Sequence, residues 1–222
     1  MEIVPIAHIE SPLKEKFGVP RQSGLAKGLR CRIVFEPEYR SADALRGLDD
    51  FDYLWLIWAF SENRVEGFRP LVRPPRLGGN RTLGVFATRS SFRPNGLAIS
   101  SVRITGVDYD CNDAPVIIVE GADLMDGTPI FDIKPYITYA DSHPDARSGF
   151  VDNEEWSSLE VVIPEEISSQ LGSDNTEALR STLALDPRPR YHDDPSREYG
   201  MSFGEYNVKF RVADGKAEVV GI

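Results

Sequence analysis

A chain of 222 residues with a formal charge of −10 and 41% hydrophobic residues is typical of a globular protein, and this composition excludes a disordered chain. The acidic balance argues against a general nucleic-acid-binding protein, because affinity for phosphate backbones comes from basic surface. The most apolar run, residues 51–60, is ten residues long and contains Asp52, whereas a membrane-spanning helix needs about 20 apolar residues.

The N-terminus and the cysteines narrow the class of protein further. The first six residues lack the basic and long apolar regions of a secretory signal, so we expect a cytoplasmic protein with no membrane segment. Cys31 and Cys111 lie far apart and form no metal-binding spacing, so we expect neither a disulfide framework nor a bound metal. Both cysteines are predicted to be small, unreactive residues of the core or of strands.

The first 140 residues are predicted to be mainly β-structure. Short apolar or alternating runs bounded by proline and glycine indicate strands at residues 3–9, 31–36, 51–60, 83–88, 98–108 and 115–121. Residues 110–113 predict a hairpin turn between the last two strands. Many short antiparallel strands at this spacing favour a barrel or a sandwich.

The segments between the strands are predicted to be irregular or briefly helical. Residues 11–24 are too rich in proline, glycine and charge to form a regular element. Residues 41–47 predict one or two helical turns, with Ser41 as N-cap and Gly47 as terminator.

The composition changes near residue 141, and residues 143–149 are predicted to be a loop or linker. Beyond it, apolar residues at helical spacing predict helices at residues 164–171 and 175–185. Two strands, near residues 203–212 and 216–221, complete a small α+β unit. We therefore expect two domains, residues 1–140 and residues 141–222.

Charge is distributed unevenly along the chain. Residues 64–93 contain seven arginines and one acid, Glu66, which gives a local net charge of +6. Residues 141–200 contain fourteen acids and five arginines, which gives a local net charge of −9. A focused basic patch can therefore exist on an acidic protein.

Two arginine-rich motifs lie in or next to this basic stretch, Arg-Pro-Pro-Arg-Leu-Gly-Gly-Asn at residues 73–80 and Arg-Ser-Ser-Phe-Arg-Pro-Asn-Gly at residues 89–96. Arginines between prolines and glycines sit on backbone that is stiff at one point and approachable at the next, which suits an anion or a planar ligand. The other interpretation is a solvated loop with surface arginines, and the twin Arg-Pro pairs favour the ligand site. Neither motif is a P-loop or a dinucleotide-binding fingerprint.

Two further motifs each allow two interpretations. Residues 123–136 contain three carboxylates, a lysine and a tyrosine, which fits either a turn with exposed acids between two strands or a site for a cation or sugar hydroxyls. Residues 186–191, Asp-Pro-Arg-Pro-Arg-Tyr, fit either a plain turn or a site for phosphate and a base.

Aromatic residues and histidines add no independent functional signal. Tyr53, Trp55 and Trp58 alternate with apolar residues, which favours core packing over stacking on a base. The histidines at positions 8, 143 and 192 are scattered, and none pairs with a serine or cysteine in a nucleophile motif, so we assign them no catalytic role.

Five segments in this order resemble one family, the TsaA-like (YaeB-like) tRNA methyltransferases, also called TrmO: residues 15–22, 73–80, 84–90, 92–95 and 126–129. The resemblance covers residues 3–140 densely, and residues 186–191 extend it to the C-terminal unit. It implies an S-adenosylmethionine-dependent enzyme that methylates N6 of threonylcarbamoyladenosine, next to the anticodon of threonine tRNAs. It also implies a mainly β fold, an antiparallel non-Rossmann β-barrel with a small C-terminal α+β domain, and a homodimer with cofactor sites near the subunit interface.

The resemblance also implies roles for individual residues. The cofactor-binding positions of the family correspond here to Pro20, Arg21, Gln22, Ser61, Glu62, Arg89, Asp123, Leu124, Asp126, Gly127 and Thr128. The resemblance does not identify the residue that accepts the N6 proton; from the chemistry of their side chains, we expect Asp126, Asp132 or Tyr136. Contacts with tRNA are expected from Arg73, Arg76, Arg93, Arg188, Arg190 and Tyr191.

The chain departs from the family pattern at two places. It has Phe60-Ser61 where the family usually has Phe-His, and Gly96 is two positions earlier than the corresponding glycine of its relatives. Because of these departures, a barrel methyltransferase that acts on another small molecule or RNA stays an alternative. A module that binds S-adenosylmethionine or RNA without turnover is a further alternative.

Overall fold

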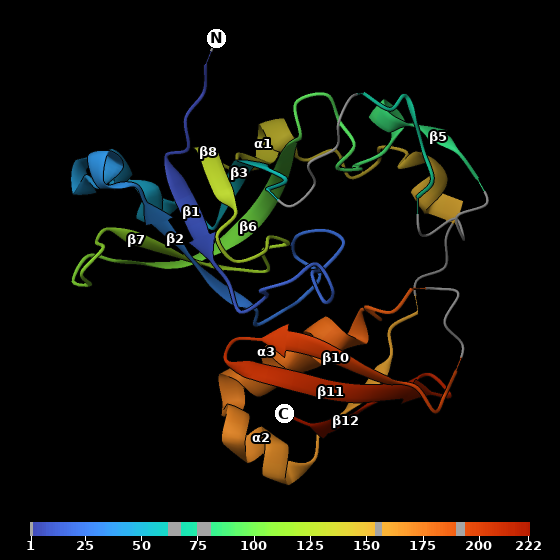
Figure 1. The fold of residues 1–222 in the computed structure, drawn as a ribbon. Coiled ribbons are helices and arrows are strands. Elements are labelled where there is room, and N and C mark those ends of the chain that lie inside the picture. Colours follow the sequence, from blue (N-terminus) through green and yellow to red (C-terminus); the bar gives the residue numbers. More distant parts are fainter. Residues whose placement is uncertain (1, 62–67, 75–80, 154–156, 190–193) are drawn as a thin grey trace.

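The structure is a computed structural model that describes residues 2–61, 68–74, 81–153, 157–189 and 194–222. Within these residues, six antiparallel strands close a barrel in the order β1-β2-β7-β6-β3-β8 (Figure 1). The strands are β1 (Ala7–Glu10), β2 (Arg30–Phe35), β3 (Tyr53–Ala59), β6 (Leu97–Asp108), β7 (Val116–Glu120) and β8 (Pro129–Pro135). The predicted antiparallel barrel is confirmed.

Alternation of side chains along the strands fills the barrel. In β3, Leu54, Leu56 and Trp58 are buried, while the residues between them lie on the outer face. The prediction of core packing is therefore right for Trp58 and wrong for Tyr53. The Tyr53 side chain is 43% exposed, and its ring packs edge-on against the ring of Tyr136 outside the barrel.

The predicted strand at residues 83–88 is only partly a strand. A two-stranded hairpin joins β4 (Leu71–Val72) to β5 (Leu83–Gly84), and a 3-10 helix, η5 (Val85–Ala87), follows at once. The chain turns there because the hydroxyl of Thr88 and the guanidinium of Arg93 both donate hydrogen bonds to the Val85 carbonyl. We call the described part of residues 68–93 the flap.

Other short helices lie between the strands. They are η1 (Pro37–Tyr39), η2 (Ala42–Leu45), η3 (Leu48–Asp50), α1 (Thr138–Asp141) and η6 (Gly149–Asn153). The predicted helical turn at residues 41–47 is η2, with Ser41 at the N-cap position, although the Ser41 side chain makes no capping hydrogen bond. Gly47 has a left-handed backbone and begins η3.

The C-terminal unit is a four-stranded sheet covered by two helices (Figure 1). The sheet has the order β10-β11-β12-β9 and consists of β9 (Glu160–Val162), β10 (Glu198–Phe203), β11 (Tyr206–Ala213) and β12 (Lys216–Gly221). Only β9 and β12 pair in parallel. The helices are α2 (Glu165–Leu171) and α3 (Ser173–Ala184), close to the predicted ranges, whereas β9 and β10 were not predicted.

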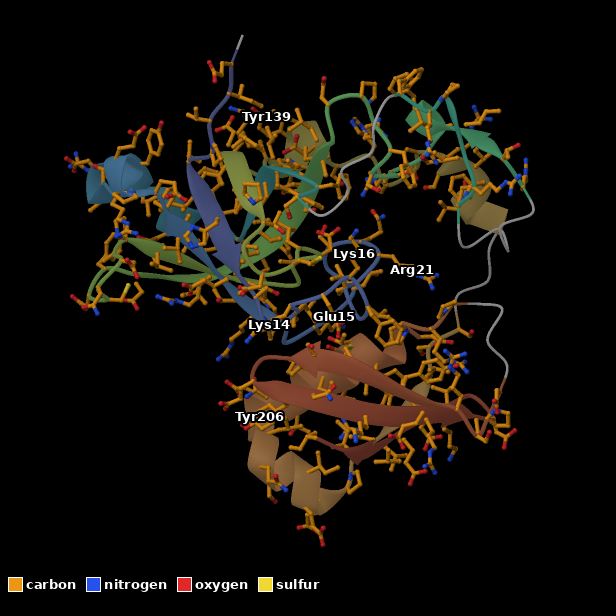
Figure 2. The ribbon with its side chains drawn as sticks, viewed as in Figure 1. Lys14, Glu15, Lys16, Arg21, Tyr139 and Tyr206 are labelled. Carbon is orange, nitrogen blue, oxygen red and sulfur yellow. The ribbon has the colours of Figure 1, made fainter. Side chains whose placement is uncertain are left out.

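The predicted irregular segment at residues 11–24 lies between the barrel and the C-terminal sheet, and we call it the N-terminal loop. The amide of Gly204 donates a hydrogen bond to the Pro12 carbonyl (2.7 Å), and the amide of Ser202 donates one to the Glu15 carboxylate (2.7 Å). The Phe17 ring stacks on aromatic rings of β10 and β11. Figure 2 shows Lys14, Glu15, Lys16 and Arg21 on this loop. The C-terminal sheet thus supports the loop from behind.

We predict that Gly18→Ala destabilises the protein more than Gly47→Ala does. Both glycines have a positive φ, so both substitutions strain the backbone. A Cβ at position 18 would lie 2.1 Å from the sulfur of the buried Met201, whereas a Cβ at position 47 meets no atom within 4 Å. Repacking around Met201 should add about 1–3 kcal/mol to the loss at Gly18.

Urea unfolding of both variants and the wild type measures these free energies. Equal losses for the two variants would show that the N-terminal loop is not pressed against β10.

Candidate active site

A crevice opens at one end of the barrel, between the N-terminal loop, the ends of β3 and β6, and the flap. Its larger part has a volume of about 540 Å³, within the range that holds small ligands. A smaller hollow of about 200 Å³ shares four lining residues with it, Val19, Trp58, Phe60 and Asp123. The two cavities form one site, which we call the crevice.

The crevice combines apolar walls with a few polar groups. Val19, Trp58 and Phe60 form apolar surface common to both parts. Arg21 and Arg89 line the larger part from opposite segments of the chain. The Arg89 guanidinium donates a hydrogen bond to the side-chain oxygen of Gln22, which connects the flap to the N-terminal loop.

A chain of hydrogen bonds lies at the base of the crevice. The Trp58 indole N–H donates to the Ser100 hydroxyl (2.9 Å), and this hydroxyl donates to Asp123 Oδ1 (2.5 Å). Trp58 and Ser100 are buried, so both need such a partner. Trp58 comes from β3, Ser100 from β6 and Asp123 from the segment before β8.

Asp123 is the carboxylate with a perturbed pKa in this site. Burial raises the pKa of Asp123 above its usual value, while the Ser100 hydrogen bond and the positive charge of Arg89 oppose the shift. Burial prevails because the solvation that a carboxylate loses is only partly replaced by the Ser100 hydroxyl, the backbone amides of Ser23 and Asp123, and the charge of Arg89. A carboxyl group whose pKa is raised by burial in a cleft is a candidate for proton transfer.

Many of the predicted cofactor residues line the crevice. Pro20, Arg21, Gln22, Arg89 and Asp123 line its larger part. Ser61, Asp123 and Thr128 line its smaller part.

The remaining predicted cofactor residues have other surroundings. Leu124 is fully buried in the hydrophobic core, and Gly127 is an exposed turn residue. Asp126 accepts a hydrogen bond from the Ser11 amide (2.9 Å) and lines a separate hollow. Glu62 lies outside the described residues.

The three candidate proton acceptors are not brought together. Asp126 lines the separate hollow just described. Asp132 lies on β8, paired across the sheet with Ile57, and forms an ion pair with Lys134 (3.0 Å). The Tyr136 ring packs on Trp55, on the outer face of the barrel.

The residues expected to contact RNA also have different surroundings. Arg73 is exposed after β4. Arg93 is half-buried, and its guanidinium donates a hydrogen bond to the Thr88 carbonyl (2.7 Å). Arg188 donates to both carboxylate oxygens of Asp186 (2.8 and 3.0 Å). Both groups therefore hold local turns. Arg76, Arg190 and Tyr191 lie outside the described residues.

Sequence reasoning missed Ser100 and Trp58 as parts of the site. Ser100 occupies an inward position of β6 between apolar residues, and a polar residue at such a position needs a partner inside the barrel. That signal was available, but the partner could not be named from one strand.

The described residues offer neither a metal site nor a membrane-spanning helix. They contain no cluster of three or more histidine, cysteine, aspartate or glutamate side chains suited to a metal ion. None of their helices is long and apolar enough to cross a membrane. Cys31 is buried in β2, where burial raises its pKa to about 12, as expected for an unreactive thiol.

Family models match both parts of the chain. The N-terminal domain of tRNA-methyltransferase O matches residues 8–142, and the TrmO C-terminal domain matches residues 157–222.

Individual relatives match over nearly the whole length. A tRNA (adenine(37)-N6)-methyltransferase of Escherichia coli K12 is 41% identical over 98% of this chain and 95% of its own. A putative S-adenosylmethionine-dependent methyltransferase, RcsF, of Pseudomonas aeruginosa is 40% identical over 93% of this chain and 90% of its own. The crystal structure of TrmO from Pseudomonas aeruginosa, 31% identical, superposes with a TM-score of 0.81 over 100% of this chain and 97% of its own.

We predict that Asp123→Asn changes the pH dependence of stability. Because the folded-state pKa of Asp123 is raised, the folded protein retains a proton that the unfolded chain has lost, so its stability falls as pH rises through that pKa. Asparagine removes the ionisation and keeps an acceptor for Ser100. The variant should therefore be more stable relative to wild type at pH 7 than at pH 4: the free energy of unfolding of the variant minus that of wild type should be larger at pH 7.

Chemical denaturation at the two pH values tests this. A variant that loses more stability at pH 7 than at pH 4 would show that Arg89 and Ser100 outweigh burial.

Proposed function

The chain belongs to the TrmO family of tRNA methyltransferases, and from this premise we propose that it methylates N6 of threonylcarbamoyladenosine at position 37 of threonine tRNAs. Like its relatives, the chain is an S-adenosylmethionine-dependent tRNA (adenine-N6)-methyltransferase, and the proposal concerns the exact substrate. One observation carries the proposal, a crevice at the end of a non-Rossmann barrel that combines apolar walls, three arginines and one partly buried carboxylate.

The residues of the crevice fit S-adenosylmethionine. Val19, Trp58 and Phe60 offer apolar surface for a planar adenine. Arg21 and Arg89 offer guanidinium donors for a carboxylate, that of the cofactor or that of the threonyl group on the substrate. The cofactor, when bound, supplies an electrophilic sulfonium methyl group.

The substrate nitrogen belongs to a ureido group, so its lone pair is delocalised and it is a weak nucleophile. The protein must hold this nitrogen in line with the methyl group, an effect that reaches about 7–11 kcal/mol in well-oriented systems. It must also accept the N6 proton.

We propose Asp123 as that proton acceptor. It lines both parts of the crevice, where it accepts a hydrogen bond from the Ser100 hydroxyl and lies within the field of the Arg89 guanidinium. Burial raises its pKa, so its carboxylate is a stronger base than that of an exposed aspartate. Asp126, Asp132 and Tyr136, the acceptors expected from sequence, have less support because they do not line the crevice among the described residues.

Two further features complete the proposal, the domain bounds from the change in composition near residue 141 and the homodimer from the family resemblance. We propose that residues 1–140 form the cofactor-binding domain and residues 141–222 a supporting domain. We also propose that the protein acts as a homodimer.

We predict that Arg89→Ala lowers kcat/KM for methylation at least tenfold, because the crevice loses a bidentate donor and its link to Gln22. Arg103→Ala is the matched control, since Arg103 is an exposed arginine on β6. Incorporation of a labelled methyl group into tRNA measures both rates. Near-normal turnover of Arg89→Ala at limiting and at saturating cofactor would refute the role of Arg89.

We predict that Asp123→Asn lowers kcat about a hundredfold, as expected for loss of a general base, while calorimetry shows unchanged affinity for S-adenosylmethionine. Asp126→Asn is the control, because an asparagine can still accept the hydrogen bond from the Ser11 amide. A large loss of kcat in Asp126→Asn together with an active Asp123→Asn would reverse the assignment.

We predict that tRNA carrying the threonylcarbamoyl group accepts the labelled methyl group and that the same tRNA without it does not. The two substrates differ only at position 37, so this comparison tests the chemistry and the substrate together. Equal methylation of both would favour a barrel methyltransferase with another RNA substrate, and cofactor binding without transfer to any tRNA would favour a binding module.

A further inference from the structure

We propose that the flap carries a stacking site for an unpaired base of the tRNA anticodon loop, formed by Phe86 and Phe68 beside the crevice. This inference rests on the proposed function, because it concerns how the same RNA is held. It assigns a role to aromatic side chains that the sequence analysis left unused.

The rings of Phe86 and Phe68 are exposed at the surface, so neither is buried in the hydrophobic core. Phe86, on η5, is 68% exposed and Phe68, just before β4, is 52% exposed. Their ring centroids are 5.9 Å apart with an interplanar angle of 24°, so they stack on each other at the surface. Grouped exposed apolar side chains are typical of binding surfaces.

The surroundings of the rings are positively charged. The Arg93 guanidinium carbon lies 5.6 Å from the centre of the Phe86 ring, and that of Arg69 lies 5.7 Å from the ring of Phe92. The sequence contains no aspartate or glutamate between residues 67 and 107. Aromatic faces within a basic surface match a single-stranded nucleic acid, which offers phosphates and bases with flat faces.

The stacking site is continuous with the crevice. A hollow of about 570 Å³ lies beside Phe86 and is also lined by Phe150 and Val151 of η6. Three of its lining residues, Gln22, Thr88 and Arg89, also line the crevice. A nucleotide next to the one that enters the crevice can therefore lie against Phe86.

RNA chemistry explains why such a site is needed. An enzyme that acts on a base draws it out of the stack, which leaves its neighbours without a stacking partner. An aromatic side chain beside the crevice can replace that partner for a base of any identity, since every base has a π-face. The flap thus orients the nucleotide at position 37 by holding the neighbouring nucleotide.

The experiment compares three substitutions of Phe86 in the full-length protein. Phe86→Ala and Phe86→Leu should lower kcat/KM for threonylcarbamoylated tRNA and the affinity for an anticodon stem-loop RNA about tenfold or more. Phe86→Trp should stay within about twofold of wild type, because it keeps a stacking face. Affinity for S-adenosylmethionine, measured by calorimetry, should stay unchanged in all three.

Tyr109→Ala is the matched control, since Tyr109 is an aromatic residue, 44% exposed, between β6 and β7 and away from the flap. It should leave RNA affinity and kcat/KM unchanged. Phe86→Leu with wild-type RNA affinity would overturn the proposal, because a leucine cannot stack. Light scattering that shows a dimer of wild type and a monomer of Phe86→Ala would also overturn it, because a second copy of the chain would then cover the rings.

The two proposals fail in different ways. If wild type methylates no tRNA, the proposed function fails, while a loss of stem-loop affinity in Phe86→Ala but not in Phe86→Trp still supports the stacking site. If wild type methylates tRNA and Phe86→Ala does so equally well, only the stacking site fails.

Discussion

The hydrogen-bond chain from Trp58 through Ser100 to Asp123 is the interaction on which the site depends. It places a carboxylate at the end of a barrel whose interior is otherwise hydrophobic, and a buried carboxylate persists only where donors compensate for lost solvation. Trp58 and Ser100 come from the paired strands β3 and β6, and Asp123 comes from the loop before β8, so the site depends on contacts between three separate segments of the chain. The raised pKa of Asp123 follows from the same geometry, because burial outweighs its donors.

The N-terminal loop carries the second half of the crevice, and it has no regular structure to hold it in place. The C-terminal sheet supplies that support through backbone hydrogen bonds and through aromatic packing around Phe17. The close contact of Gly18 with Met201 shows how little space separates the two. The buried residues of both units also form one hydrophobic cluster. The acidic C-terminal unit thus supports the crevice from outside: among the described residues, none of its side chains lines the crevice.

The arginines of the basic stretch have different physical roles despite their similar sequence surroundings. Both Arg89 and Arg93 line the crevice, but Arg93 also donates to backbone carbonyls and shapes the turn after β5, whereas Arg89 bonds to Gln22. Arg69 lies over an aromatic ring. A guanidinium has five donors in a rigid fork, so one residue type can stabilise a turn, bind a carboxylate or stack on a ring, depending on the surrounding backbone.

The sequence by itself determined the mainly β character, most barrel strands and the family. Period-two alternation, turn residues and ordered motifs are local signals that survive without knowledge of the fold. It also identified Pro20, Arg21, Gln22 and Arg89, which line the crevice. Only the tertiary structure decided that Asp123 lines the crevice while Asp126, three residues later, lines another hollow. The physical reason is that both residues lie in the loop before β8, where contacts with distant segments set the direction of each side chain. Asp123 accepts a hydrogen bond from Ser100 of β6, whereas Asp126 accepts one from the Ser11 amide of the N-terminal loop.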